Sequence, residues 1–576
     1  MRARDSQESQ ASDQRQRHDE MILVAKTAPS TAPDKERVML ANAAFGAGDT
    51  QCGQSAPESS EAPTFTPQGA KKVIRPLGSM IWLSCILFAV VFAIFRVRKL
   101  RASNASRRAA VLRGLGASDV HKKRIVGFFH PYCNAGGGGE RVLWTAIAMI
   151  QRTEPDIVSV VYSGDTDASK AEIIDKVKAR FDISLDPATL HFVFLHSRHL
   201  VEDAAWPRFT LLGQSLGSMY LAWEAMSALI PDLYIDTMGY AFTFPVAKYA
   251  GGAPVGAYVH YPTISTAMLA RVHTRTAGPT NSSSISASPL LSRGKALYYR
   301  AFMHLYARAL RTADVLMANG TWTAAHVDQI LGHTDALLDA LHWLPPLVLL
   351  KFMEPATPPR HARIVFPPCD TRAMAEFPLD GRERVIVSVA QFRPEKDHAA
   401  MLRALSAFFA AHPEMKDVRM VLIGGSRNAG DAARIEGLRA LAAELGIEGS
   451  VEFVVNAPYP LMLSWLARAS VGLNTMVDEH FGISVVEYMA AGLIPVAHAS
   501  AGPLLDIAVP YQGQPTGFHA TTPETFADAF YKALSLPPAE DRAMRERARA
   551  LAVGKFSEAA FEEAWNASGW RDWPVR

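Results

Sequence analysis

Short apolar runs alternate along most of this chain with longer stretches that have the apolar spacing of a helix. Residues 124–129 (RIVGFF), 471–476 (VGLNTM) and 493–499 (LIPVAHA) are such runs, whereas 140–151 and 482–491 have helical spacing. Apolar runs bounded by turn residues are typical of buried strands, and their alternation with helices is typical of parallel sheets. The pattern therefore predicts an α/β protein built from Rossmann-like units.

Two such units are predicted, with a crevice between them. The further strands are expected at residues 156–162, 190–195, 233–236, 255–258, 315–318, 384–389, 419–425 and 451–455. We expect an N-terminal domain over residues 120–370, a C-terminal domain over 371–555, and a C-terminal helix at 556–576 that returns to the first domain.

The N-terminal region has a different pattern. Residues 1–70 lack periodicity and are expected to be disordered. Residues 76–95 (PLGSMIWLSCILFAVVFAIF) carry no charge and have the length that a bilayer core requires, although a buried core helix is the alternative. Basic residues are denser after this segment than before it. The positive-inside rule then predicts a single transmembrane signal anchor with the large C-terminal part in the cytosol.

Three other stretches are more apolar than the core of a soluble protein needs, or interrupt the alternation of strands and helices. Residues 209–230 carry one charge, Glu224, and favour a helix packed in the domain and partly dipped into a bilayer surface, with a purely buried helix as the alternative. Residues 341–353 are too short to span a membrane and are either a membrane-touching loop or a surface insertion. Residues 274–292 are rich in serine and predict a flexible loop near the acceptor entrance.

Composition narrows the function classes. The net charge of +3 gives no reason to expect a nucleic-acid partner. The four cysteines, Cys52, Cys85, Cys133 and Cys369, have no C-x-x-C spacing, which argues against a zinc site or a disulfide framework. No metal site and no cofactor are expected.

Glu479 and Glu487, in the segment after the run at 471–476, are the strongest candidate site residues. In an open parallel sheet, Glu479 would lie in the crevice loop and Glu487 about one turn into the following helix. Helix N-termini attract phosphate, and carboxylates accept hydrogen bonds from sugar hydroxyls, so the pair suits a nucleotide-sugar. The alternative is that both glutamates only cap and solvate the helix.

Cations and glycines are expected to complete the site. Arg393 and Lys396 follow the strand at 384–389 and would meet a diphosphate leaving group, unless they form a solvated charge cluster. Four glycines, Gly136 to Gly139, separate a strand from a helix and would let backbone N–H groups approach a ligand. Their spacing matches neither a dinucleotide nor a Walker motif. His260 ends a strand at the crevice and either contacts sugar or acceptor or is structural.

Several long motifs together resemble one family. These are HPYCNAGGGGERVLW, YVHYPTIS, FPPCD, QFRPEKDH and EHFGISVVEYMAAGLIPVAHASAGPLLDI. They are similar to the GDP-mannose-dependent alpha-1,2-mannosyltransferases that extend dolichol-linked oligosaccharides, which are retaining glycosyltransferases of the GT-B fold with an E-x7-E motif. The likeness covers roughly residues 76–572.

The resemblance implies roles for individual residues. It implies that Glu479 contacts the transferred sugar and that Glu487 contacts the ribose of the donor. The remaining assignments implied in this way are catalytic for Arg393, Lys396 and His260, donor-binding for Phe481, Gly482, Gly138 and Gly139, and acceptor-binding for Asn134 and Tyr261.

The resemblance also implies an activity and a location. The enzyme would move mannose from GDP-mannose to the dolichol-pyrophosphate oligosaccharide, as its fourth and fifth mannoses, at the cytosolic face of the endoplasmic reticulum membrane, for protein N-glycosylation. A complex with other mannosyltransferases of the pathway is a further implied partner. Front-face transfer with retention is the favoured mechanism, and Glu479 as a covalent nucleophile is the second.

The chain departs from the family pattern at the acceptor side. Ala267 stands where the pattern continues with Asp after YPTIST, and residues 274–292 and 335–361 are longer than usual. Two alternatives therefore stay open: another lipid-directed glycosyltransferase with a different acceptor, and a non-catalytic membrane scaffold of the same fold. The intact Glu479, Glu487, Arg393 and Lys396 speak against the scaffold.

Overall fold

The computed structural model describes residues 70–572 except 117, 118, 120, 265, 276–282, 342 and 344–360. The predicted disordered tail therefore lies outside the described residues apart from Ala70, and so does most of 341–353. The chain divides into two compact units, one that ends at Lys99 and one that continues from Leu100. Each unit is described by itself.

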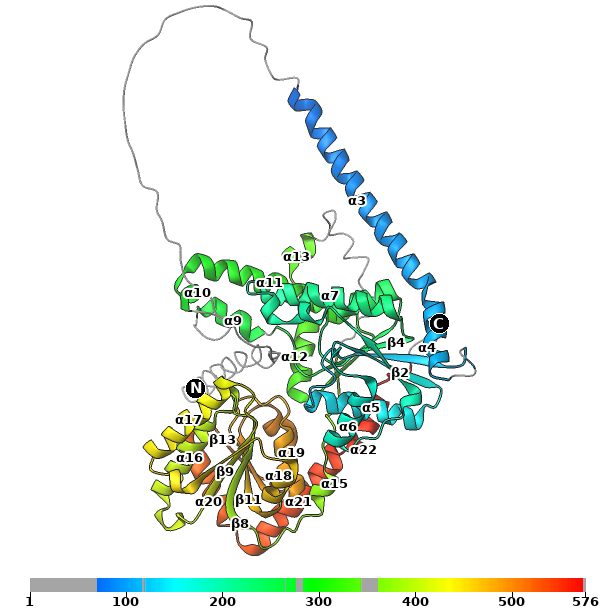
Figure 1. The fold of residues 1–576 in the computed structure, drawn as a ribbon. Coiled ribbons are helices and arrows are strands. Elements are labelled where there is room, and N and C mark those ends of the chain that lie inside the picture. Colours follow the sequence, from blue (N-terminus) through cyan, green and yellow to red (C-terminus); the bar gives the residue numbers. More distant parts are fainter. Residues whose placement is uncertain are drawn as a thin grey trace, which may run out of the picture. The chain divides into compact units, whose positions relative to one another are not determined.

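The first unit contains most of helix α3 (Ala70–Ala102), which includes the predicted transmembrane segment (Figure 1). Between Leu87 and Phe95 its large apolar side chains are exposed; Phe88, for example, is 73% exposed. The side chains at 71–83 and 86 lie outside the description. Among the residues that are described, no helix has both the length and the apolar character that crossing a membrane requires.

A seven-stranded parallel sheet forms the N-terminal domain, in the order β3-β2-β1-β4-β5-β6-β7. Its strands are β1 (Arg124–Phe129), β2 (Ile157–Ser163), β3 (Leu190–Phe194), β4 (Leu233–Asp236), β5 (Val255–Val259), β6 (Val315–Ala318) and β7 (Arg363–Ile364). The helices of this domain are α4 (Asn104–Gly114), α5 (Gly138–Thr153), α6 (Lys170–Phe181), α7 (Thr210–Ala228), α8 (Thr243–Pro245), α9 (Thr266–Thr274), α10 (Ser283–Ala287), α11 (Pro289–Arg311), α12 (Thr321–Leu331) and α13 (Ala336–Leu341).

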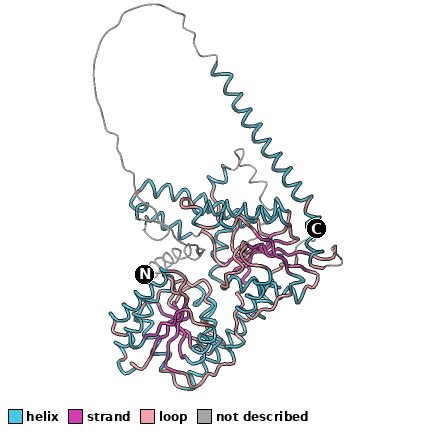
Figure 2. The backbone as a smooth tube through the Cα atoms, in the orientation of Figure 1, coloured by secondary structure: helices cyan, strands magenta, loops and turns pink. Residues whose placement is uncertain are grey.

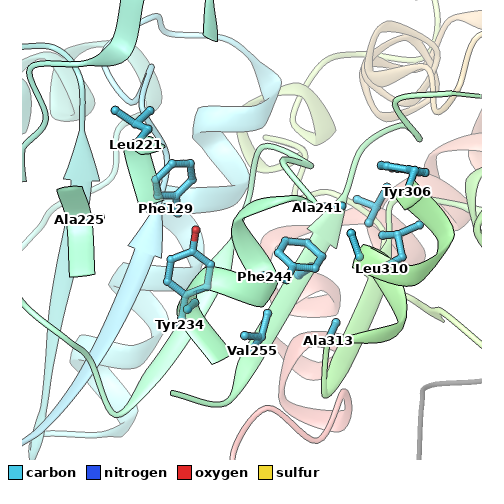
Figure 3. Packing of buried hydrophobic residues seen from close by; sticks show 14 of the residues in the cluster. Phe129, Leu221, Ala225, Tyr234, Ala241, Phe244, Val255, Tyr306, Leu310 and Ala313 are labelled. Carbon is cyan, nitrogen blue, oxygen red and sulfur yellow. The ribbon is translucent and has the colours of Figure 1, made fainter. Parts of the chain in front are cut away.

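Apolar side chains from strands and helices interlock on one face of this sheet (Figure 3). Phe129 and Tyr234 come from adjacent strands, and their ring centroids are 5.8 Å apart. Leu221 of α7 and Leu310 of α11 belong to the same cluster and are almost completely buried. Because helices cover both faces of a parallel sheet, its strands are apolar throughout, which explains the uninterrupted apolar runs in the sequence.

A six-stranded parallel sheet forms the C-terminal domain, in the order β10-β9-β8-β11-β12-β13. Figure 2 shows the strands of the protein in magenta, with helices around them. Its strands are β8 (Glu383–Val389), β9 (Arg419–Gly424), β10 (Val451–Val455), β11 (Ala469–Asn474), β12 (Ile494–His498) and β13 (Phe518–Ala520). The helices of this domain are α15 (Arg372–Ala375), α16 (His398–Ala411), α17 (Ala429–Glu444), α18 (Tyr459–Arg468), α19 (Ile483–Ala491), α20 (Pro523–Leu534) and α21 (Pro538–Phe556). The two Rossmann-like sheets make this a GT-B architecture.

The last helix, α22 (Glu558–Ala567), packs on α5 of the N-terminal domain. Phe561, Trp565 and Trp570 are buried in the apolar cluster of that domain. Next to it, Cys369 N–H donates to the Phe556 carbonyl at 2.9 Å, so the two segments that connect the domains are hydrogen-bonded to each other.

Two of the stretches that interrupt the alternation, 209–230 and 274–292, contain helices. Helix α7 covers most of 209–230 and packs closely, because an added Cβ on Gly213 would lie 2.2 Å from the Trp206 ring. The flexible loop predicted at 274–292 was wrong in part, since residues 283–287 form α10 and α11 begins at Pro289. Serine alone does not prevent a short helix when apolar residues such as Ile285 lie beside it.

Candidate active site

The glycine run brings the N-terminal domain against the start of helix α19. The loop after β1 ends at Gly137, whose N–H donates to Glu140 Oε2 at 2.7 Å, and α5 begins at Gly138. A Cβ added to Gly138 would lie 2.7 Å from Ile483 Cδ1, and one on Gly139 would lie 3.5 Å from His260 Nε2. The approach at Gly138 favours a residue without a side chain there, whereas the distance at Gly139 is an ordinary van der Waals contact.

Glu479 lies in the loop between β11 and α19, where it forms an ion pair with Lys396. The Lys396 Nζ to Glu479 Oε2 distance is 2.5 Å, and Asn474 Nδ2 donates to the same oxygen at 3.4 Å. Burial raises the pKa of Glu479, but the Lys396 ammonium, His480 and Asn474 together outweigh this effect, so this pKa lies below its usual range. Glu479 is therefore a carboxylate at neutral pH, and Lys396 is its counter-ion.

The backbone of Lys396 is held by its own loop and by the loop after β11. It ends the short 3₁₀ helix Pro394–Lys396, and Thr475 Oγ1 donates to its carbonyl at 3.0 Å. Arg393, by contrast, lies beside Glu395, with Nη1 and Oε1 3.7 Å apart. Burial and the nearby Arg427 lower the pKa of the Arg393 guanidinium.

Glu487 is in the second turn of α19 and lines a cavity of about 500 Å³ between the two domains. Burial raises the pKa of Glu487 to about 7; Arg141 and Arg180 oppose this rise, whereas Asp370 adds to it. The cavity is lined by both domains: Gly136, Gly137, Gly138, Arg141, Arg180, Phe181, Cys369, Asp370, Val389, Ala390, Gln391, Ile423, Gly424, Gly425, Asn456, Ala457, Tyr459, Met462, Ile483 and Glu487.

Three other predicted site residues, His260, Tyr261 and Asn134, lie in loops of the N-terminal domain. His260 follows β5, and its Nε2 lies 3.2 Å from the Thr237 carbonyl oxygen, facing Gly139. Tyr261 is only 6% exposed, so its ring is covered by protein. Asn134 lies in the loop after β1, where its N–H donates to Asp165 Oδ2 at 3.0 Å.

Phe481 and Gly482 shape the loop. The Phe481 ring is 4% exposed and packs against Phe366 and Phe556, so the side chain lies in the core and not in the cavity. Gly482 has a φ of 108°, which side chains rarely adopt, and it is the residue before α19. Both residues fix the direction in which the helix leaves the loop.

Sequence reasoning did not identify the cations that face Glu487. Arg141 belongs to α5 and Arg180 to α6, far from Glu487 in the sequence. Arg141 also lies 3.3 Å from Glu558 at the start of α22. The sequence feature that could have indicated Arg141 as a site residue was its position directly after the glycine run and Glu140. In the part of the chain that the structure describes, no group of three or more His, Cys, Asp or Glu residues is arranged to hold a metal ion.

Comparisons with known proteins agree with this architecture. The chain matches the family described as ALG11 mannosyltransferase N-terminus over residues 123–331, and the family described as Glycosyl transferases group 1 over residues 370–551. Among solved structures, an alpha,alpha-trehalose 6-phosphate synthase from Burkholderia multivorans has a TM-score of 0.52 at 16% identity, with 78% of this chain and 98% of that chain covered. At this identity the likeness shows the fold alone.

Two relatives are similar over most of their length. The Xenopus laevis protein named GDP-Man:Man(3)GlcNAc(2)-PP-Dol alpha-1,2-mannosyltransferase is 43% identical over 490 residues, which cover 84% of this chain and 93% of that protein. The Homo sapiens protein of the same name is 43% identical over 453 residues, covering 77% of this chain and 86% of that protein. The chain therefore belongs to the family of GDP-Man:Man(3)GlcNAc(2)-PP-Dol alpha-1,2-mannosyltransferases, which are glycosyltransferases.

Proposed function

We propose that this protein transfers mannose from GDP-mannose to Man(3)GlcNAc(2)-PP-dolichol in alpha-1,2 linkage. The observation that carries the proposal is the 43% identity to relatives of that name, which extends over 84% of the chain and includes both domains. The geometry supports it, because the glycine loop and Glu487 line one cavity, and the loop that leads into the helix of Glu487 carries the ion pair of Glu479 with Lys396.

The acceptor in the relatives' name already carries three mannoses, so the first mannose added is the fourth. We propose that a second round adds the fifth, as the family resemblance implies. Both rounds use the same donor site, and only the acceptor end changes between them.

We propose front-face transfer with retention at the anomeric carbon. The bond from that carbon to the diphosphate breaks, the bond to the acceptor oxygen forms on the same face, and the acceptor proton moves to the leaving diphosphate. Lys396 and Arg393 would stabilise the charge that grows on the diphosphate. The ion pair between Glu479 and Lys396 favours this route over nucleophilic attack by Glu479, since a paired carboxylate is less available to attack carbon.

Two apolar surfaces support a membrane location. The exposed apolar side chains of α3 suit a transmembrane anchor in the endoplasmic reticulum with both domains cytosolic, by the positive-inside rule.

In the second unit, α7 and α11 are in contact, because the Phe209 and Tyr298 rings lie 5.5 Å apart. We propose that this face of the N-terminal domain rests on the bilayer. The exposed large apolar side chains in and next to these two helices are Phe209, Leu212, Leu216, Tyr220, Leu290, Leu291 and Leu297, and Arg208 and Arg293 are also exposed. Association with other mannosyltransferases of the pathway is a further expectation, which co-purification tests.

The test is mass analysis of lipid-linked glycans after incubation of the detergent-solubilised protein with GDP-mannose and Man(3)GlcNAc(2)-PP-lipid. We expect products one and two hexoses heavier, both shortened again by an alpha-1,2-specific mannosidase. Lys396→Ala should abolish most of the product, and Lys416→Ala, at an exposed lysine of the same domain, should not. Transfer to a different lipid acceptor, or from another nucleotide-sugar in parallel incubations, would contradict the proposal.

A further inference from the structure

Four aromatic rings from both domains stack beside the loop that carries Glu479. Tyr261, Trp322 and His326 belong to the N-terminal domain, whereas His480 belongs to the C-terminal domain and directly follows Glu479. The His480 ring centroid lies 4.7 Å from that of Tyr261 and 5.3 Å from that of Trp322, with interplanar angles of 30° and 25°. Trp322 in turn lies 3.8 Å from His326. His480 therefore contacts two rings of the opposite domain.

The Glu479 loop depends on contacts with its surroundings. Asp478 has a φ of 53°, and Gly482 has a φ of 108°, so left-handed residues stand on both sides of Glu479 and His480. A left-handed conformation at a residue other than glycine persists only where neighbouring contacts hold it. Within its own domain the loop is held by the Ser500 hydroxyl, which accepts from Asp478 N–H at 2.6 Å, and by Gly502 N–H, which donates to the Glu479 carbonyl at 2.9 Å.

The rings of the N-terminal domain are themselves tied to the C-terminal domain. Thr321, which precedes Trp322, donates its N–H to Asp506 Oδ2 at 2.8 Å and its hydroxyl to Asp506 Oδ1 at 2.5 Å. Tyr261 and Trp322 are 6% and 8% exposed. The stack is thus a packed contact between the domains, anchored by a hydrogen-bonded carboxylate at its edge.

We infer that His480 is a positioning residue, through which Tyr261 and Trp322 of the N-terminal domain hold the Glu479 carboxylate on Lys396. The inference deepens the proposed function and rests on it. Glu479 and His480 are consecutive, so any movement of the His480 ring out of the stack displaces the peptide that carries Glu479. Displacing a reacting or positioning group by about 1 Å can reduce a rate about 100-fold.

The contact is made by a flat ring that is uncharged at neutral pH. Burial lowers the pKa of His480 to about 4, and among the charged groups around it Glu479 opposes this shift, whereas Lys396, His326 and His260 reinforce it. The imidazole is therefore neutral at neutral pH. Stacking depends on the ring planes and not on a hydrogen bond from the imidazole. A substitution that keeps a ring should therefore differ in effect from one of similar size that has no ring.

The experiment compares His480→Phe, which keeps a ring, with His480→Gln, which keeps polarity without a ring. We expect His480→Gln to lower kcat about 10- to 100-fold with little change in the KM for GDP-mannose, and His480→Phe to stay within about threefold of wild type. His412→Gln is the matched control, because His412 stacks on Tyr531 at 4.0 Å within the C-terminal domain.

Hydrogen exchange of residues 475–482 provides a readout that needs no substrate. Exchange there should be faster in His480→Gln than in wild type and unchanged in His480→Phe and His412→Gln. Equal exchange and equal kcat in the Gln and Phe variants would overturn the inference. A wild-type protein that transfers no mannose would instead refute the proposed function, and the exchange measurement would still decide whether the stack holds the loop.

Discussion

Glu487 should make GDP-mannose binding depend on pH near neutrality. If its carboxylate accepts a hydrogen bond from a ribose hydroxyl, only the ionised form binds the donor well. Burial raises the pKa of Glu487 to about 7, from its ordinary value of 4.5, because Arg141 and Arg180 offset the loss of water only in part. The free protein at pH 7 therefore has this group about half protonated, and donor binding should drive the proton off.

The magnitude follows from the ionised fraction. With a pKa of about 7, that fraction is about one tenth at pH 6 and about nine tenths at pH 8. The apparent Kd is the intrinsic Kd divided by the competent fraction, so it should fall about tenfold between pH 6 and pH 8. Binding at pH 7 should release about half a proton per donor bound.

Calorimetric titration with GDP-mannose in two buffers of different ionisation enthalpy measures both quantities. Glu487→Gln is the matched variant, since it keeps the shape and cannot ionise. In that variant the proton release and the pH dependence of Kd should disappear, with Kd raised at pH 8. A wild-type Kd that is flat from pH 6 to pH 8, or a pH dependence that Glu487→Gln retains, would refute the reasoning.

The same pKa has a consequence for stability. A carboxyl group whose pKa is raised by folding binds more protons in the native state than in the unfolded state, so its contribution to stability falls as pH rises from about 4.5 to about 7. A rise of this size corresponds to about 3 kcal/mol. Above pH 7, Glu487→Gln should therefore melt at a higher temperature than wild type, and below pH 5 the two should melt alike.

Four further outcomes are expected. Lys396→Ala should lower turnover about 100- to 1,000-fold, and turnover near wild type would remove this ammonium from the site. Gly138→Ala should lower turnover because its Cβ would lie 2.7 Å from Ile483 Cδ1, and Ile483→Val, which lacks that atom, should restore part of it in kinetic assays. Activity should survive EDTA, whereas a loss reversed by magnesium or manganese would reveal a metal requirement. Protease added to sealed microsomes should digest the chain beyond residues 76–95. Asn281 begins an Asn-Ser-Ser acceptor sequence for N-glycosylation, so a glycan there, detected by endoglycosidase, would reverse the orientation.

The apolar periodicity was sufficient to locate most strands, because each strand is buried on both faces and reads as a continuous apolar run. Strands β1, β4 and β10 have the bounds expected from the sequence. Strands β7 and β13 were not predicted, since they have two and three residues and leave almost no periodic signal. The order of the strands, such as β3-β2-β1-β4, depends on how the crossovers pack and has no local signature.

The site also has features that the sequence indicated and features that only the structure showed. Glu479 and Lys396 were predicted at the site because charged residues in the loops after buried strands lie at the edge of the sheet where a ligand binds, and Glu487 was predicted because it lies in the helix that follows. That Lys396 pairs with Glu479 and not with Glu487 could not be predicted, since it depends on β8 and β11 being neighbours in the sheet.

Only the tertiary structure decided which groups from one domain face the other. Arg141 beside Glu487 and Tyr261 on His480 are contacts between separate domains, so no spacing along the chain encodes them. The Phe481 ring lies in the core because the direction of its side chain depends on the φ of 108° at Gly482 and on the packing of Phe556. The sequence by itself thus indicated the candidate residues for the chemistry, and the packing of the two domains determined the charges and contacts that those residues acquire.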